Sequence, residues 1–82
     1  MSANLWGDFL KTTRRYYRID RRQIAYLKFI LEGYEGLANL STIDAERGVV
    51  VVHISPGCED DVESLIEDLG RHMIIRTASG PA

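Results

Sequence analysis

The chain contains few of the residue types that carry common protein chemistry. Its 82 residues include one cysteine, Cys58, two prolines and two histidines. A single cysteine excludes an intramolecular disulfide and any CxxC motif, and sparse cysteine is typical of a reducing cytoplasm. No HExxH or HxH spacing is present either. The composition therefore predicts no metal and no cofactor, and we expect a protein that is not an enzyme.

Long apolar stretches are also missing. No segment approaches the roughly 20 residues that a membrane-spanning helix needs. The first residues have no basic stretch ahead of an apolar run, as a secretory signal would have. We therefore expect a cytoplasmic protein with no membrane partner. The length allows one small domain, whose limited core would gain stability from dimerisation.

Charge is distributed unevenly, although the formal net charge is only -2. Seven basic residues and one acidic residue lie between Lys11 and Lys28, whereas three basic and ten acidic residues follow from Phe29 onward. All seven aromatic residues also fall in the first 34 positions. The small net charge argues against a general nucleic-acid binder, but the basic, aromatic first third remains a candidate binding region.

Hydrophobic periodicity predicts strand, helix, strand, strand, helix, strand. We expect strands at 14–19, 37–44, 49–55 and 74–78, and helices at 21–35 and 56–69. This order is typical of an α+β, ferredoxin-like βαββαβ fold, with a four-stranded antiparallel sheet in the order 4-1-3-2 and two helices on one face. Residues 1–12 are expected to form a partly ordered N-terminal arm, 13–78 the domain and 79–82 a tail.

Local signals set the expected ends of the helices. Asp20 is a suitable N-cap for the first helix and Gly36 a suitable residue just after its end. Ser55 followed by Pro56 predicts the start of the second helix. On the first helix, Tyr26 and Tyr34 fall on the apolar side, whereas Phe29 falls outside it.

The third strand, VVVVHIS, is apolar on both of its faces, which is typical of a central strand. If Val50 packs against the helices, Val49 and Val51 lie on the other face of the sheet. A monomer would leave this patch in water, and exposed apolar patches usually mark partner sites. We therefore expect a homodimer formed through the sheet face or an edge strand. Alternatively, the N-terminal arm folds over the patch with Trp6 and Phe9.

The first strand places Arg14, Tyr16 and Arg18 on the same open face of the sheet. With Val49, Val51 and His53 they form the predicted ligand or partner surface, suited to a small anionic ligand or another protein. The alternative is nucleic-acid binding, in which arginines hold phosphate and Tyr16 stacks on a base. A third interpretation is that the arginines pair with acidic residues of the second half of the chain.

Cys58 with His53 or His72 as a base would form a nucleophilic pair, but neither spacing matches a catalytic motif. The place of Cys58 in the apolar stripe of the second helix favours a small packed residue. We therefore predict structural roles for all three, with no catalytic residue and no metal ligand.

Between Tyr17 and Arg76 the chain resembles a small bacterial family of unknown function. The resemblance is carried by IAYLKFILEGYEGLANLSTID (24–44), GVVVVHISPG (48–57) and the acidic second helix. The resemblance implies the ferredoxin-like fold, but it implies no activity, cofactor or catalytic residue. More distantly, the element order resembles the regulatory ACT-type domains, which carry a glycine between the first strand and first helix. Asp20 and Arg21 stand there in this chain, which argues against an amino-acid effector site.

Together these patterns predict a non-catalytic binding or regulatory module that forms a homodimer through its sheet. The alternative is a nucleic-acid-binding domain that uses the basic and aromatic first strand.

Overall fold

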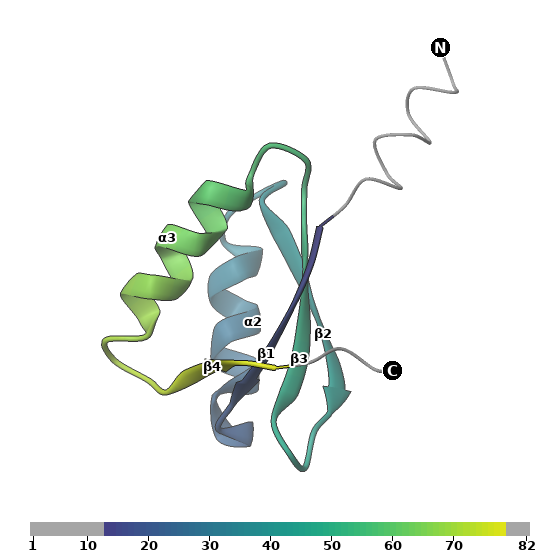
Figure 1. Ribbon diagram of the computed structural model, residues 1–82, viewed down its shortest axis with the longest axis vertical. Coiled ribbons are helices and arrows are strands. Elements are labelled where there is room, and N and C mark those ends of the chain that lie inside the picture. Colours follow the sequence, from purple (N-terminus) through teal and green to yellow (C-terminus); the bar gives the residue numbers. More distant parts are fainter. Residues whose placement is uncertain (1–12, 79–82) are drawn as a thin grey trace.

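A computed structural model describes residues 13–78 of the chain (Figure 1). The strands are β1 (Thr13–Ile19), β2 (Ala38–Asp44), β3 (Val49–Ile54) and β4 (Ile75–Thr77). The helices are α2 (Ile24–Glu32), which follows the 3₁₀ turn η1 (Arg21–Gln23), and α3 (Glu59–Leu69). The expectations for residues 1–12, including Trp6 and Phe9, and for the tail lie outside the described residues.

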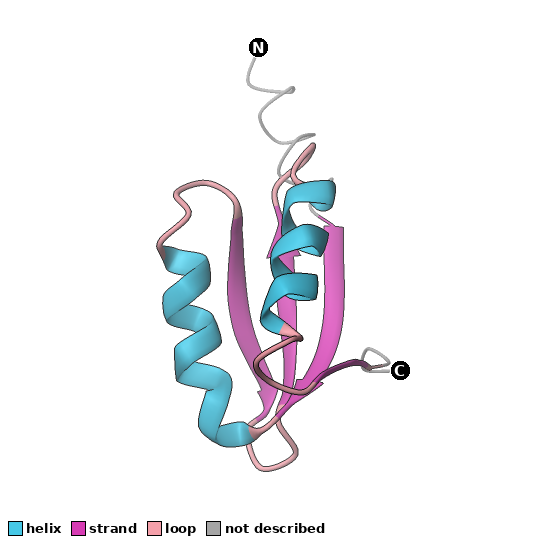
Figure 2. Ribbon diagram, turned by 90° about the vertical axis from the view of Figure 1, so that its left-hand side faces the viewer, coloured by secondary structure: helices cyan, strands magenta, loops and turns pink. Residues whose placement is uncertain are grey.

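The four strands form one antiparallel sheet in the order β2-β3-β1-β4. This is the predicted order 4-1-3-2 counted from the opposite edge, and β3 is an interior strand as expected. Both helices cover the same face of the sheet (Figure 2). The predicted ferredoxin-like α+β fold is therefore confirmed, and the other side of the sheet is free of helices among residues 13–78.

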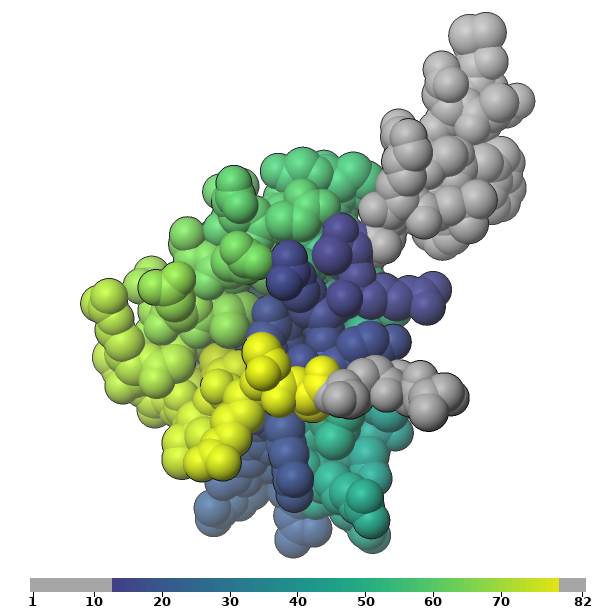
Figure 3. Space-filling model, viewed as in Figure 1, coloured from purple at the N-terminus to yellow at the C-terminus, as the bar shows by residue number. Residues whose placement is uncertain are grey.

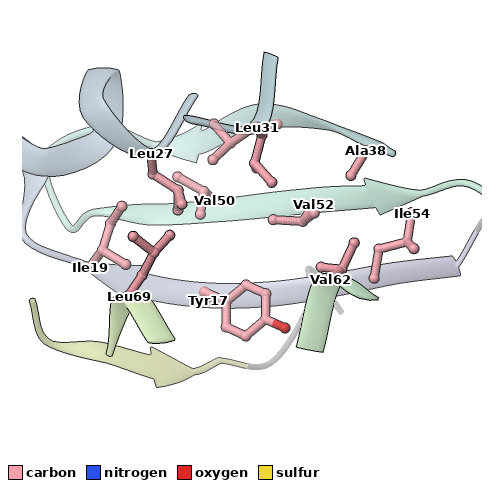
Figure 4. Packing of buried hydrophobic residues seen from close by; sticks show 11 residues of the cluster. Tyr17, Ile19, Leu27, Leu31, Ala38, Val50, Val52, Ile54, Val62 and Leu69 are labelled. Carbon is pink, nitrogen blue, oxygen red and sulfur yellow. The ribbon is translucent and has the colours of Figure 1, made fainter. Parts of the chain in front are cut away.

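The core fills the space between the sheet and the two helices (Figure 4). Alternate residues of β1 and β3 point into it, because successive side chains of a strand point to opposite faces. Each fully buried aliphatic side chain contributes about 1.5–3 kcal/mol relative to exposure. The buried cluster comprises Tyr17, Ile19, Leu27, Leu31, Ala38, Leu40, Val50, Val52, Ile54, Val62 and Leu69.

The start of α3 differs from the prediction. Ser55 and Pro56 do not open the helix; they belong to a turn in which the Cys58 N–H donates to the Ser55 carbonyl at 3.0 Å. Gly57 in this turn has φ +85°, a left-handed conformation that cannot continue a right-handed helix. The helix therefore begins at Glu59, after Cys58.

The first helix is shorter than predicted and its aromatic residues are less buried. It ends at Glu32 instead of residue 35, and Gly36 has the expected positive φ of 77° four residues later. Phe29 is exposed, as predicted, but Tyr26 and Tyr34 are each about half exposed rather than packed in the core. The apolar arc of this helix is therefore narrower than the sequence pattern indicates.

Candidate functional site

The strand register places the six predicted surface residues on two adjacent strands. Across β1 and β3, Arg14 lies opposite His53, Tyr16 opposite Val51, and Arg18 opposite Val49. Directly opposite residues of antiparallel strands share a face. The structure therefore brings these residues together on the side away from the helices, which we call the open face. Their role in binding stays a prediction.

Val51 is buried within a single chain, contrary to the expectation of an apolar patch left in water. Its side chain is 3% exposed, and it lies between Tyr16 on β1 and Ser41 on β2. Val49 is half-buried. Tyr16, which lies directly opposite on β1, is much larger than valine, and its ring shields Val51 from water although no helix among residues 13–78 lies above this face. The open face is consequently less apolar than the pattern of β3 indicates.

Arg76 also belongs to the open face, although it was not among the predicted residues. It lies on β4 directly opposite Arg18 of β1. Figure 3 shows β4, in yellow, beside β1, in purple, on the surface of the molecule. The sequence could have predicted this position of Arg76. In the predicted fourth strand Ile75 is the apolar residue that faces the core, and the next residue, Arg76, must then face the opposite side of the sheet.

Two other arginines of the first third, Arg15 and Arg22, have carboxylate partners. Arg15, on the helix side of β1, pairs with Glu63 of α3 at 3.0 Å. Arg22 pairs with Asp20 at 2.9 Å. Among residues 13–78, no ion pair involves Arg14, Arg18 or Arg76. Pairing with the acidic second half of the chain therefore accounts for Arg15 but, within residues 13–78, not for the arginines of the open face.

Arg18 is held in place by its own contact with the β2–β3 hairpin. Its Nε donates to the Arg47 carbonyl oxygen at 3.2 Å. Within residues 13–78, no other hydrogen bond uses its guanidinium, so its two terminal nitrogens remain available as donors.

A hollow of about 320 Å³ lies beside this arginine, at the end of β1 next to β4. Its lining consists of Arg18, Ile19, Asp20, Ile74 and Arg76. Ile74 is 68% exposed, which is unusual for isoleucine, and forms an apolar part of this lining. The hollow thus combines two guanidinium groups with an apolar wall.

Asp20 is the acidic residue of the hollow, and Arg22 engages both of its carboxylate oxygens. Oδ1 accepts from the Arg22 N–H at 2.9 Å and from Nε at 3.2 Å, and Oδ2 accepts from a terminal nitrogen at 2.9 Å. These hydrogen bonds lower the pKa of Asp20 to about 2. Asp20 is also the N-cap of the following turn, as predicted.

Cys58 and His53 lie on opposite sides of the sheet. Cys58 is partly buried and packs against the core on the helix side, whereas His53 belongs to the open face. The geometry therefore does not bring these two together as nucleophile and base, which must lie within hydrogen-bonding reach. Within residues 13–78, no group of three His, Cys, Asp or Glu side chains is arranged to hold a metal ion.

Neither helix among the described residues is long and apolar enough to cross a membrane. Fold and surface together define a small ferredoxin-like α+β domain with an arginine-bearing open sheet face. Residues 17–73 match the family model described as Domain of unknown function (DUF4911), and the chain belongs to this family. Searches of curated proteins and of solved structures found no match.

Proposed function

We propose that this chain is a non-catalytic binding module whose open face holds an anionic ligand. The grouping of Arg14, Arg18 and Arg76 on the side of the sheet away from the helices carries this proposal. Guanidinium groups present paired N–H donors that match the oxygens of carboxylates and phosphates. Arginines directly opposite each other also repel, so Arg18 and Arg76 favour a bound anion between them.

Apolar contacts on the same face favour an organic ligand over a bare ion. Tyr16 and Val49 are partly buried and lie next to the arginines on β1 and β3. Binding sites for small molecules usually combine an apolar surface with a few polar groups that fix orientation. The open face has this combination, with arginine as the orienting group.

A small anion fits this face better than nucleic acid does. Single-strand binders gain much of their affinity from aromatic side chains that stack on successive bases. On the open face Tyr16 is the aromatic residue of β1, and β3 contributes Val49, Val51 and His53 beside it. The net charge of -2 also gives little long-range attraction for a polyanion.

The proposal is tested by titrating ¹⁵N-labelled full-length protein with pyrophosphate and with citrate. We expect the backbone amide signals of β1, β3 and β4 to shift, and the double variant R14S/R18S to lose the shifts. The control, R21S/R71S, removes the same charge from two exposed arginines outside the sheet. Shifts that map elsewhere, or an equal loss in both double variants, would contradict a ligand site on the open face.

We also propose that the chain forms a homodimer, because strand β2 offers an edge at which a second copy can pair. This strand has seven residues and lies at the edge of the described sheet. From Ala38 to Thr42 the strand has no lysine, proline or β-bulge, the features that usually protect an edge against pairing, and its register shifts only between Thr42 and Asp44. We propose that a second copy pairs with this edge, because the burial of Val51 removes much of the case for contact through the open face.

A further inference from the structure

The hollow at the end of β1, next to β4, brings two guanidinium groups beside an apolar side chain. It is lined by Arg18 and Arg76, which lie opposite each other on neighbouring strands, and by the exposed Ile74. We infer that it binds a small phosphate monoester, with the phosphate between the two guanidinium groups and the organic part against Ile74. This inference rests on the proposed function, because it names the ligand class of the same face.

The charge of the lining favours a dianion. A phosphate monoester carries close to two negative charges at neutral pH and three acceptor oxygens, whereas a carboxylate carries one charge. Two guanidinium forks can each donate a pair of hydrogen bonds to phosphate oxygens. Arg18 is also partly oriented already, since its Nε is bonded to the Arg47 carbonyl, which lowers the entropy lost on binding.

The acidic wall of the hollow does not cancel this attraction. Asp20 is the one carboxylate in the lining, and both of its oxygens accept hydrogen bonds from Arg22. The Arg22 side chain therefore offsets the charge that would repel an anion. The volume, about 320 Å³, lies at the lower end of the usual range for small-molecule sites, so we expect a ligand with a small organic group.

Phenyl phosphate is the probe for this site, with binding to the full-length protein measured by calorimetry at constant salt. We expect R76S to lower the affinity at least fivefold, and R76K to lower it less, because lysine keeps the charge but loses the fork. I74S should reduce the preference for phenyl phosphate over inorganic phosphate at least threefold. R71S, which changes an exposed arginine after α3, is the control and should stay within twofold of the wild type.

Thermal unfolding provides a second readout. A ligand that binds the native state raises the melting temperature, so the same concentration of phenyl phosphate should raise that of the wild type more than that of R76S. R76S should also fold, since Arg76 is exposed and the substitution removes a repulsion with Arg18.

Several outcomes separate this inference from the broader proposal. Loss of affinity in R14S but not in R76S would overturn the phosphate site, while the open face would remain the binding surface. Tighter binding of an oligothymidylate than of phenyl phosphate, with a steep dependence on salt, would overturn it in favour of nucleic acid. No binding of phenyl phosphate, pyrophosphate or citrate would overturn both.

Discussion

Gly48, in the β2–β3 hairpin, lies directly against Ile19 at the end of β1. The Ile19 N–H donates to the Gly48 carbonyl at 2.9 Å, which ties the two segments together. Gly48 has φ +72°, and a Cβ at this position would collide with the Ile19 carbonyl oxygen. Gly36 has a similar φ of +77° but open space around it. A substitution at Gly36 therefore measures the cost of the left-handed backbone alone. A substitution at Gly48 measures that cost together with the collision with Ile19.

We expect G36A to lower the free energy of unfolding by roughly 1–2 kcal/mol, the cost of a left-handed conformation for a residue with a Cβ. G48A adds the collision with Ile19 and should lose more, on the order of 3 kcal/mol. Urea denaturation of both variants measures the difference. Equal losses would show that the approach of Gly48 to Ile19 adds nothing to the cost.

The alternation of side chains along a strand decides which residues share a face. This alternation was enough to predict one shared face for the six surface residues: Arg14, Tyr16, Arg18, Val49, Val51 and His53. The burial of Val51 could not be predicted, because it depends on how the side chains around it pack on the assembled sheet, Tyr16 of β1 among them. The hollow beside Arg18 was also beyond prediction, since it depends on how the residues before β4 approach the end of β1.

At the scale of elements, β1 and α3 are joined by polar contacts at one end of their interface. The Thr13 hydroxyl donates to Glu59 at 2.9 Å, and Arg15 pairs with Glu63 one turn further along the helix. The other Glu59 oxygen accepts from the Gly57 N–H at 3.1 Å. Glu59 thus stabilises both the turn before α3 and the attachment of that helix to the sheet.

The predicted strands lie within one residue of the observed ones, because apolar alternation and the glycine turns mark them clearly. The start of α3 was predicted wrongly, since Ser followed by Pro fits a helix start and the left-handed turn at Gly57 leaves little trace in a periodicity pattern. The end of α2 was placed three residues late because Tyr34 continues the apolar spacing beyond the last helical turn.

Acid should weaken the attachment of α3. Hydrogen bonds from its own backbone and from Thr13 lower the pKa of Glu59 below its ordinary value of 4.5. A lowered folded-state pKa gives stability that is fully present above about pH 4.5 and is lost as the pH falls through the folded-state value. We therefore expect E59Q to be less stable than the wild type at pH 7, with a smaller difference at pH 3.

Urea denaturation at the two pH values measures this effect. The control is E67Q, which changes an exposed carboxylate near the other end of the same helix. A difference between wild type and E59Q that is the same at pH 7 and pH 3 would mean that the Glu59 charge does not stabilise the start of the helix.

At the scale of the whole molecule, a small domain with a seven-residue edge strand gains most from pairing that strand. Antiparallel pairing of β2 with β2 of a second copy would place Ser41, the central residue of the strand, beside its counterpart. It would continue the sheet across the dimer and satisfy backbone groups at the β2 edge. Both open faces would then lie on the same side of one larger sheet, so two ligand sites would remain accessible.

We expect the full-length protein to sediment as a dimer and S41K to shift it toward monomer, because two lysines would meet at the centre of the pairing and repel. S64K makes the same substitution at an exposed position of α3 and should leave the dimer intact. Amide hydrogen exchange distinguishes the mode of contact, since edge pairing slows exchange along β2 in the dimer, whereas contact through the open face does not. A monomeric wild type, or equal dissociation of S41K and S64K, would contradict pairing through β2.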